Sequence, residues 1–306
     1  MDLTGKVAIV TGSGQGLGLA YAKELAREGA AVVVNDVKQE AADSAVAEIT
    51  AAGGKAVAVV APVGSTETAQ ALVKAAVDNF GRLDVIVTNA GILRDKVLWK
   101  MTDDDFDAVI NVHLKGTFTC VREAVNQFRE QGGGGRVICI GSPAGQRGNF
   151  GQTNYSGAKA GIVGMVRTWA MELKKAGITA NAVCPVAVTA MTETVPIFAP
   201  AIAEWKETGK LPDIMRREVG MGTPEDVAGV IAYLASDAAA DITGQAISVG
   251  GDRLALWSHP ELTEIAYRDG GFSADDVAAV WPGTFAGHVE TVGEEFPAEL
   301  LAGVKK

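Results

Sequence analysis

A tyrosine and a lysine one helical turn apart, Tyr155 and Lys159, are the residues of this sequence best placed to move a proton. On a helix, positions i and i+4 share a face, so the lysine ammonium can lie beside the phenol. A free phenol has a pKa of about 10 and is a poor base at neutral pH, but a neighbouring cation favours the phenolate. Ser142 adds a hydroxyl that could hold a substrate oxygen within reach of the same proton. Together these three side chains predict proton transfer on or off an alcohol.

Because this tyrosine–lysine spacing also occurs on solvated surface helices, it needs support from the rest of the sequence. A glycine-rich segment, 11–18, follows an apolar run at 7–10 and precedes a helical pattern. Glycine lets backbone N–H groups approach a pyrophosphate, and a helix start adds partial positive charge. The spacing G-x-x-x-G-x-G differs from the general dinucleotide fingerprint but can serve the same purpose, although an ordinary tight turn is the alternative. The dinucleotide interpretation places Gly12, Ser13, Gln15, Gly16, Leu17 and Gly18 at the cofactor.

Asp36 ends the second expected strand and indicates which dinucleotide binds. A carboxylate there can accept hydrogen bonds from both ribose hydroxyls of an adenosine and would repel a 2′-phosphate. Gln15 is neutral and offers that phosphate no counter-charge. We therefore expect NAD rather than NADP, with a solvated turn acid as the alternative. Asn89, Ala90 and Gly91 follow the fourth expected strand as a small-residue turn that could pass close to the cofactor.

Short apolar runs alternate with helical patterns along most of the chain. Strands are expected at 7–10, 31–36, 55–60, 83–88, 136–140, 179–183 and 246–249, and helices at 19–28, 39–52, 66–79, 102–131, 153–175 and 224–236. This alternation predicts an α/β, doubly wound (Rossmann-type), mostly seven-stranded parallel sheet with helices on both faces. Such sheets bind ligands at the carboxyl ends of their strands, where the glycine-rich segment and Ser142 both fall.

Two segments lie outside the alternation. Residues 191–222 are rich in proline and large apolar side chains, and we interpret them as a lid; a helical pair packed on the surface or against a second subunit is the alternative. Residues 252–306 form a C-terminal extension with a helix signal at 274–280, but they cannot form a core alone. We expect one dehydrogenase-like domain, 1–251, with the extension packed on it or on a partner subunit.

Composition limits the function. The formal net charge of −10 argues against nucleic acid or an anionic membrane as a partner. No apolar run approaches the roughly 20 residues needed to cross a bilayer, and the first residues lack a signal-peptide pattern, so we expect a cytoplasmic protein. The three cysteines fall in apolar runs typical of buried free thiols, and the sparse histidines and cysteines predict no metal site.

The motifs taken together resemble the short-chain dehydrogenase/reductase family over residues 1 to about 251. They are T-G-x-x-x-G-x-G at 11–18, N-A-G at 89–91, Ser142, Y-x-x-x-K at 155–159 and G-Q-x-I-x-V-G-G at 244–251. Within the family, the stretches 33–36, 89–95 and 148–155, and the tail, resemble the (3R)-hydroxyacyl-CoA dehydrogenase part of peroxisomal multifunctional enzyme type 2.

The resemblance implies reversible oxidation of a secondary alcohol to a ketone, with Tyr155 as the base, Ser142 on the substrate oxygen, and Lys159 on the nicotinamide ribose and lowering the Tyr155 pKa. It adds Val63, Pro185, Val188 and Thr189 to the cofactor site. A 3-hydroxyacyl-CoA is the first choice of substrate, a hydroxysteroid the second and a 3-oxoacyl-ACP the third. A non-catalytic NAD-binding sensor is disfavoured because all three catalytic side chains are present. A homodimer or homotetramer is implied, through helices 102–131 and 153–175.

Two positions depart from the family pattern. His113 stands where many members carry a catalytic asparagine, and we treat it as a candidate proton relay, with a satisfied helix histidine as the alternative. The family's P-G after the sixth strand appears as Pro185-Val186, and Met191 comes one residue early. The role of Thr189 as partner of the nicotinamide amide depends on that alignment.

Overall fold

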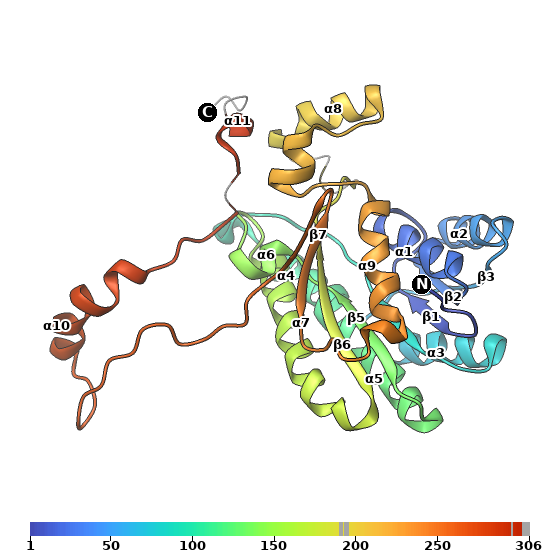
Figure 1. Ribbon diagram of the computed structural model, residues 1–306, viewed down its shortest axis with the longest axis horizontal. Coiled ribbons are helices and arrows are strands. Elements are labelled where there is room, and N and C mark those ends of the chain that lie inside the picture. Colours follow the sequence, from blue (N-terminus) through green and yellow to red (C-terminus); the bar gives the residue numbers. More distant parts are fainter. Residues whose placement is uncertain (190–191, 193–195, 295, 302–306) are drawn as a thin grey trace.

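The computed structural model describes residues 1–189, 192, 196–294 and 296–301. Its centre is an eight-stranded sheet in the order β3-β2-β1-β4-β5-β6-β7-β8 (Figure 1). Seven strands are parallel, and β8 pairs antiparallel with β7. The strands are β1 Val7–Val10, β2 Ala31–Asp36, β3 Lys55–Val60, β4 Val85–Thr88, β5 Gly135–Ile140, β6 Ile178–Pro185, β7 Ala246–Gly250 and β8 Arg253–Leu256. The predicted doubly wound α/β fold is therefore confirmed, with an eighth strand that was not predicted.

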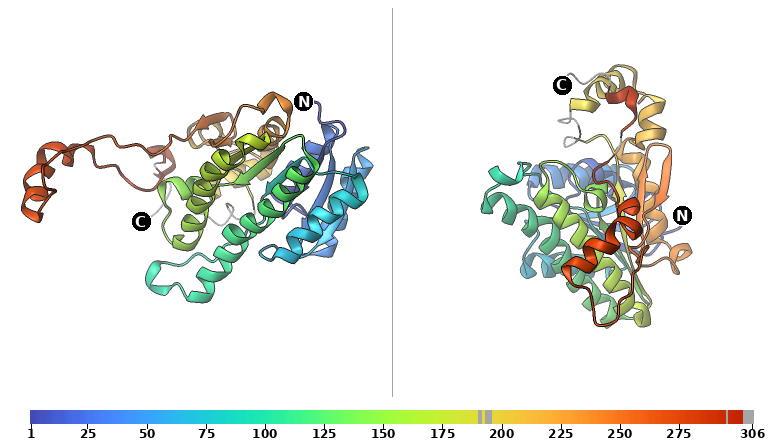
Figure 2. Two further views of the ribbon diagram at one scale, coloured as in Figure 1. Left: turned by 90° about the horizontal axis from the view of Figure 1, so that it is seen from below. Right: turned by 90° about the vertical axis from the view of Figure 1, so that its left-hand side faces the viewer.

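Helices cover both faces of the sheet, as expected (Figures 1 and 2). On one face α1 (Gly16–Arg27), α2 (Gln39–Ala51) and α9 (Pro224–Ala235) share a buried apolar cluster with the strands. On the other face α3 (Thr66–Phe80), α5 (Gly116–Gln131) and α7 (Thr153–Glu172) share a second one. Since parallel strands are apolar on both sides, each face of this sheet needs such a layer.

The long helix expected over 102–131 is present but irregular. Thr102 and Asp105 form a reciprocal capping box at the start of α4 (Asp103–Ile110). Residues Asn111–Lys115 then form a π-helical turn before α5 begins. Such turns are frequent at functional sites. This one contains His113 and sets the direction in which its ring points.

The segment between β6 and α9 forms its own small layer. It contains a 3₁₀ turn at Pro196–Phe198, helix α8 (Ala199–Thr208) and a π-helical turn at Ile214–Val219. Their apolar side chains form a third cluster, separate from the two sheet faces. Met191 lies outside the described residues. That this segment acts as a lid stays a prediction.

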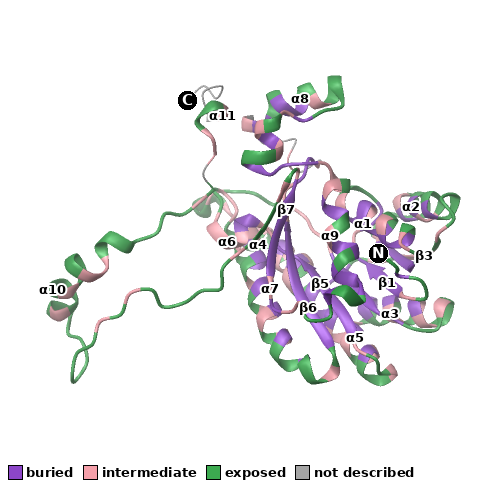
Figure 3. Cartoon of the chain, viewed as in Figure 1, coloured by how far each residue is buried: buried purple, intermediate pink, exposed green. Residues whose placement is uncertain are grey.

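The C-terminal extension leaves the body after β8 as a long arm that carries the expected helix, α10 (Ala274–Thr284), with Ser273 as its cap (Figure 1). No residue of α10 is buried, and the arm is exposed along most of its length (Figure 3). The chain then returns, and α11 (Ala298–Leu301) lies beside the turn at 196–198 (Figure 2). The extension is thus neither a separate core nor packed along its whole length on this chain.

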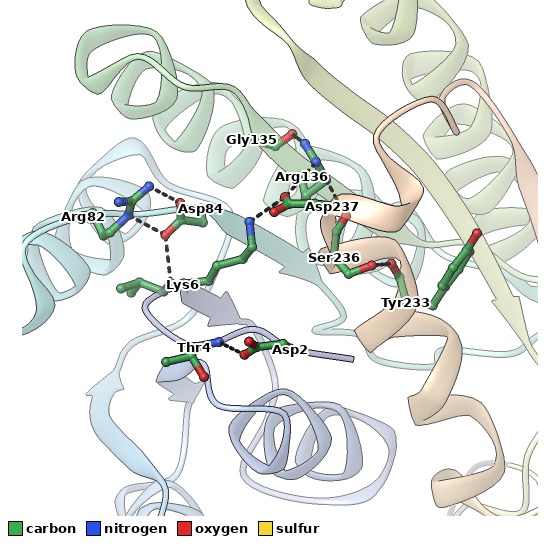
Figure 4. A network of polar contacts seen from close by, with 11 residues as sticks. Asp2, Thr4, Lys6, Arg82, Asp84, Gly135, Arg136, Tyr233, Ser236 and Asp237 are labelled. Carbon is green, nitrogen blue, oxygen red and sulfur yellow. Dashed lines mark hydrogen bonds and ion pairs between the residues drawn. The ribbon is translucent and has the colours of Figure 1, made fainter.

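At the amino end of the sheet, charged side chains form a paired network (Figure 4). Asp84 accepts hydrogen bonds from the Arg82 guanidinium and from the Val7 backbone N–H. Arg136 donates to the Ser236 carbonyl, and the Asp237 carboxylate contacts both Arg136 and Lys6. Lys6 and Arg136 lie at the starts of strands, and Ser236 and Asp237 lie just beyond α9.

Among the described helices, none combines the length and the low polarity needed to cross a bilayer.

Candidate active site

A cavity of about 730 Å³ lies at the carboxyl ends of the strands, where the strand order reverses between β1 and β4. It extends from the glycine-rich loop past Tyr155 to the segment that contains α8. Most residues expected at the site line it, namely Gly12, Gln15, Gly16, Leu17, Gly18, Asp36, Val63, Asn89, Ala90, Gly91, His113, Ser142, Tyr155, Lys159, Pro185 and Thr189. This is the place where doubly wound sheets bind dinucleotides.

Two expected residues do not line the cavity, Ser13 and Val188. The Ser13 hydroxyl donates to the Val10 carbonyl and accepts from the Asn35 N–H, so it ties the loop to the strands. Val188 is buried, and its N–H donates to the Gly222 carbonyl. Both residues hold backbone in place from behind the site.

The glycine-rich loop has the geometry that a pyrophosphate requires. Gly12 has a φ of +62°, and a Cβ on it would lie 2.7 Å from the Ala90 Cα. Gln15, the N-cap of α1, makes no capping hydrogen bond through its side chain. The first N–H groups of α1 therefore have no side-chain cap, and they can bind an anion. The loop fits a dinucleotide, and only glycine fits the close approach at position 12.

The asparagine of N-A-G holds two loops together. The Asn89 side-chain amide donates to the carbonyls of Thr11 and Gly12, both at 3.0 Å. In return, the Thr11 hydroxyl accepts the N–H groups of Asn89 and Ala90. The loop after β4 is thus locked against the glycine-rich loop, which makes the floor of the cavity rigid.

Asp36 lies at the end of β2 with its carboxylate directed at the glycine-rich loop. One oxygen accepts the Gly14 N–H and the other accepts the Lys38 N–H, each at 3.1 Å. A Cβ on Gly14 would meet that carboxylate at 2.7 Å. The position suits an adenosine ribose. Lys38 also lines the cavity, a cation whose side chain the sequence reasoning did not consider.

Ser142, Tyr155 and Lys159 lie together on the wall of the cavity. Ser142 ends the β5 loop and caps the short helix α6 (Pro143–Arg147), its hydroxyl accepting the Ala144 N–H at 3.2 Å. Tyr155 and Lys159 lie one turn apart on α7, with the ammonium 5.5 Å from the centre of the phenol ring. The ammonium donates to the Ile140 carbonyl at 2.6 Å, which anchors it below the ring.

The expected lowering of the Tyr155 pKa by Lys159 is not observed. Burial raises the pKa of the Tyr155 phenol above its usual value, and a hydrogen bond with Ser142 opposes this only in part. Burial also lowers the pKa of Lys159 to about 8. The pKa of Tyr155 is raised rather than lowered because desolvation of the buried phenol outweighs its hydrogen bond with Ser142. An added positive charge at the site would favour the phenolate.

His113 lies in the same cavity, edge-to-face with the Tyr155 ring at 5.2 Å between ring centres. Its Nε2 is 2.8 Å from the Ile92 carbonyl and 3.0 Å from the Ile92 N–H, so it holds the backbone after N-A-G. Burial, then Lys159, lowers the pKa of His113 to about 3, so the ring is neutral. Its Nδ1 is buried and has no partner among the described residues. Gly91 is required beside it because a Cβ there would collide with the imidazole.

The substrate half of the cavity contains residues that sequence reasoning did not single out as site residues. They come from the loop after β4, from the turn before α7, from the segment around α8 and from the end of the C-terminal extension: Leu93, Asn149, Gln152, Val186, Phe198, Val219, Met221, Glu294 and Phe296. The apolar composition of 191–222 was a usable signal for Phe198. Nothing in the sequence of the extension pointed to Glu294 or Phe296, because their place depends on the return of the arm.

A family model described as short chain dehydrogenase matches residues 6–197. The chain therefore belongs to the short-chain dehydrogenase family, and it is an oxidoreductase that acts on CH–OH groups. Members of this family use NAD or NADP. The family prediction is confirmed.

Relatives refine the comparison. The chain is 45% identical over 252 residues, 81% of its length and 97% of the relative's, to a 3-oxoacyl-(acyl-carrier-protein) reductase from Synechocystis sp.. It is 40% identical over 299 residues, 94% of its length and 90% of the relative's, to hydroxyacyl-CoA dehydrogenase ChsB1 from Mycobacterium tuberculosis. Mouse peroxisomal multifunctional enzyme type 2 is 46% identical over 200 residues, 62% of this chain and 27% of that protein. A solved short chain dehydrogenase from Mycobacterium avium matches with a TM-score of 0.83 at 36% identity, covering 97% of this chain and 99% of that one.

Proposed function

We propose that the protein is an NAD-dependent dehydrogenase that interconverts a 3-hydroxyacyl-CoA and the 3-oxoacyl-CoA. The observation that carries the proposal is the meeting of Ser142, Tyr155 and Lys159 in one cavity, with the Asp36 carboxylate at its other end. A proton acceptor, a hydroxyl for the substrate oxygen and a cation lie within one site. That set suits oxidation of a secondary alcohol.

Ser142, Tyr155 and Lys159 each have a separate role in the proposed reaction. Ser142, held as the cap of α6, donates to the substrate oxygen and orients the carbinol carbon. Tyr155 accepts the hydroxyl proton as the ketone forms, and returns a proton in the reverse direction. Lys159, fixed on the Ile140 carbonyl, presents its remaining N–H groups to the nicotinamide ribose. The bound dinucleotide supplies the hydride acceptor and, when oxidised, a positive charge that favours the tyrosine phenolate.

His113 supports this arrangement without changing its own charge. Because its ring is neutral and its Nε2 is committed to Ile92, the free Nδ1 is the atom available to hold a water. We propose that His113 fixes the Ile92 backbone and holds a water through Nδ1, and that this water, rather than the ring, passes the proton. This role combines the two alternatives left open by the sequence.

The preference for NAD follows from Asp36. Its carboxylate is held by two backbone N–H groups beside the loop that would bind the pyrophosphate. A 2′-phosphate at that ribose would meet this negative charge, and Lys38 would have to compensate for it.

The choice of an acyl-CoA rests on the extension. The match to the hydroxyacyl-CoA dehydrogenase ChsB1 covers 94% of the chain, whereas the match to the acyl-carrier-protein reductase covers 81%. The extension reaches the cavity through Glu294 and Phe296. The second candidate is a 3-oxoacyl-ACP reductase, favoured by the higher identity of 45% with that relative. A hydroxysteroid remains the third.

The experiment is a substrate panel. We expect oxidation of 3-hydroxyacyl-CoA with NAD to exceed reduction of 3-oxoacyl-ACP and oxidation of hydroxysteroids in kcat/KM. Faster turnover of the ACP substrate would move the assignment to the second candidate. Absence of turnover on all three, with NAD bound, would contradict the proposed substrates and reopen the question of the substrate.

We further propose a cytoplasmic homodimer or homotetramer. All three cysteines are free and buried, as a reducing compartment allows. Phe106 on α4 and Phe118 on α5 are 41% and 42% exposed, which gives these helices apolar surface for a second copy. Light scattering distinguishes monomer, dimer and tetramer.

A further inference from the structure

The end of the C-terminal extension is fastened to the helix that carries the catalytic serine. Arg147, the last residue of α6, donates through Nε to the Gly293 carbonyl and through Nη2 to the Thr291 hydroxyl, each at 3.1 Å. The Arg147 carbonyl accepts the Gly293 N–H at 2.7 Å. Three hydrogen bonds on one residue fix the point at which the arm returns. Because α6 has Ser142 as its cap, this point has a set position relative to the catalytic centre.

From this anchor the chain enters the substrate half of the cavity. Phe296 lines the cavity and packs edge-to-face on Phe198, with 5.5 Å between ring centres and 81° between ring planes. Phe198 is itself buried and also lines the cavity. Phe296 and Leu300 both pack on the apolar cluster around α8. The returning segment therefore joins α6 to the segment around α8, and its apolar contact falls on the cavity wall.

We propose that Phe296 is a specificity-determining residue that, with Phe198, forms the apolar wall against which the distal part of an acyl chain packs. This inference rests on the proposed function for the class of substrate. Chains long enough to reach the wall gain buried apolar area, worth about 0.8 kcal/mol or roughly fourfold in binding for each methylene covered. Chains too short to reach it gain nothing. The arm thus gives the enzyme a preference for longer chains, with Arg147 as the positioning residue.

A purely structural role for Phe296 would have a different signature. If it only held α8 in place, its loss would affect short and long substrates alike, or only thermal stability. The test is therefore a ratio between chain lengths. Phe272, an exposed phenylalanine on the arm and not in the cavity, supplies the matched control.

The experiment compares wild type, Phe296→Ala, Phe296→Leu, Thr291→Val and the control Phe272→Ala. With NAD saturating, kcat/KM is measured for 3-hydroxybutanoyl-CoA and 3-hydroxydecanoyl-CoA. We expect Phe296→Ala to lower the decanoyl-to-butanoyl ratio about tenfold, Phe296→Leu to restore most of it, and Thr291→Val to lower it by a smaller factor. Phe272→Ala leaves the ratio unchanged. An equal effect of Phe296→Ala on both chain lengths, or none, overturns the inference.

A second readout is independent of the assigned substrate. Binding of 1-decanol and 1-butanol to the NAD-loaded protein is measured by calorimetry for the same variants. If wild type oxidises neither thioester but Phe296→Ala still weakens decanol binding about tenfold and butanol binding not at all, the proposed substrate is wrong and the wall stands. If both thioesters are oxidised and Phe296→Ala behaves like Phe272→Ala in both assays, the wall is wrong and the proposed function stands.

Discussion

The two ends of the sheet differ in whether their buried polar groups have partners within the protein. At the amino end, Asp84 is satisfied by Arg82 and by a backbone N–H, and Arg136 by a carbonyl and a carboxylate (Figure 4). At the carboxyl end, Lys159 is buried with no carboxylate partner among the described residues, and the His113 Nδ1 has no partner there. A buried polar group without a partner costs free energy.

This difference separates stability from function. At the amino end the polar groups bind one another, which fixes the strand starts and leaves these groups without hydrogen-bonding capacity for a ligand. At the carboxyl end Lys159 and the His113 Nδ1 are still able to form hydrogen bonds, and the polar atoms of a dinucleotide and a substrate can supply the partners. Substitutions at the two ends should therefore change different measurements.

The largest effect is expected from Tyr155→Phe. Removal of the hydroxyl abolishes proton transfer, which contributes roughly 100-fold to 10,000-fold to the rate. We expect kcat to fall by that factor while the dissociation constant for NAD, measured by fluorescence titration, stays near the wild-type value. Tyr267→Phe, at an exposed tyrosine, is the control. Near-normal turnover of Tyr155→Phe would remove the central assignment.

Because of His113, the free energy of unfolding should fall as the pH is lowered below about 6.5. Its pKa is about 3 in the folded protein and near 6.5 when unfolded, so between these values the unfolded chain binds more protons. The contribution of the neutral ring is complete above pH 6.5 and is lost as the pH falls toward 3. The loss amounts to a few kcal/mol at pH 4.

Urea unfolding from pH 4 to pH 8 checks this. We expect His113→Asn to flatten the acid limb of the unfolding free energy relative to wild type. His288→Asn, at an exposed histidine, is the control variant. Identical pH profiles for wild type and His113→Asn would mean that the ring is protonated without cost.

Asp36→Ala should change the choice of cofactor. Without the carboxylate, hydrogen bonds to the ribose of NAD are lost and repulsion of a 2′-phosphate disappears, leaving Lys38 beside that position. Hydrogen bonds to charged groups are worth about 1.5–3 kcal/mol, so kcat/KM for NAD relative to NADP should fall roughly 10-fold to 100-fold. Asp43→Asn on α2 is the control. A wild-type preference for NADP would contradict the role of Asp36.

The fold and the cofactor half of the site could be predicted because both depend on local sequence. Short apolar runs fixed the positions of the parallel strands, and the residues at their carboxyl ends had to meet at one edge. The glycine-rich loop, Asp36, Asn89 and Ser142 were found in this way.

The rest depends on contacts distant in sequence. Ser13 does not line the cavity, because its hydroxyl donates to the Val10 carbonyl and accepts the Asn35 N–H; its place at the cofactor stays a prediction. The raised pKa of Tyr155 reflects burial, which spacing on a helix does not reveal. Phe296 lies at the cavity beside the point where Arg147 binds Gly293, a residue 146 positions later in the sequence. No local pattern encodes such a return.

The smallest expected effect belongs to the amino end. Arg136→Met removes one of two donors to the buried Ser236 carbonyl, which then keeps only the Ala239 N–H at 3.4 Å, while Asp237 is 79% exposed and loses little. The loss of one hydrogen bond costs roughly 1 kcal/mol, so the free energy of unfolding in urea should fall by about that amount.

Catalysis provides the comparison for Arg136→Met. Because the network lies at the sheet end opposite the cavity, kcat/KM should equal the wild-type value at temperatures where the variant is folded. Arg129→Met, at an exposed arginine near the end of α5, should change neither quantity. A fall in kcat/KM with unchanged stability would show that the two ends of the sheet are coupled through the strands. It would contradict the proposal that the amino end serves stability and the carboxyl end serves binding.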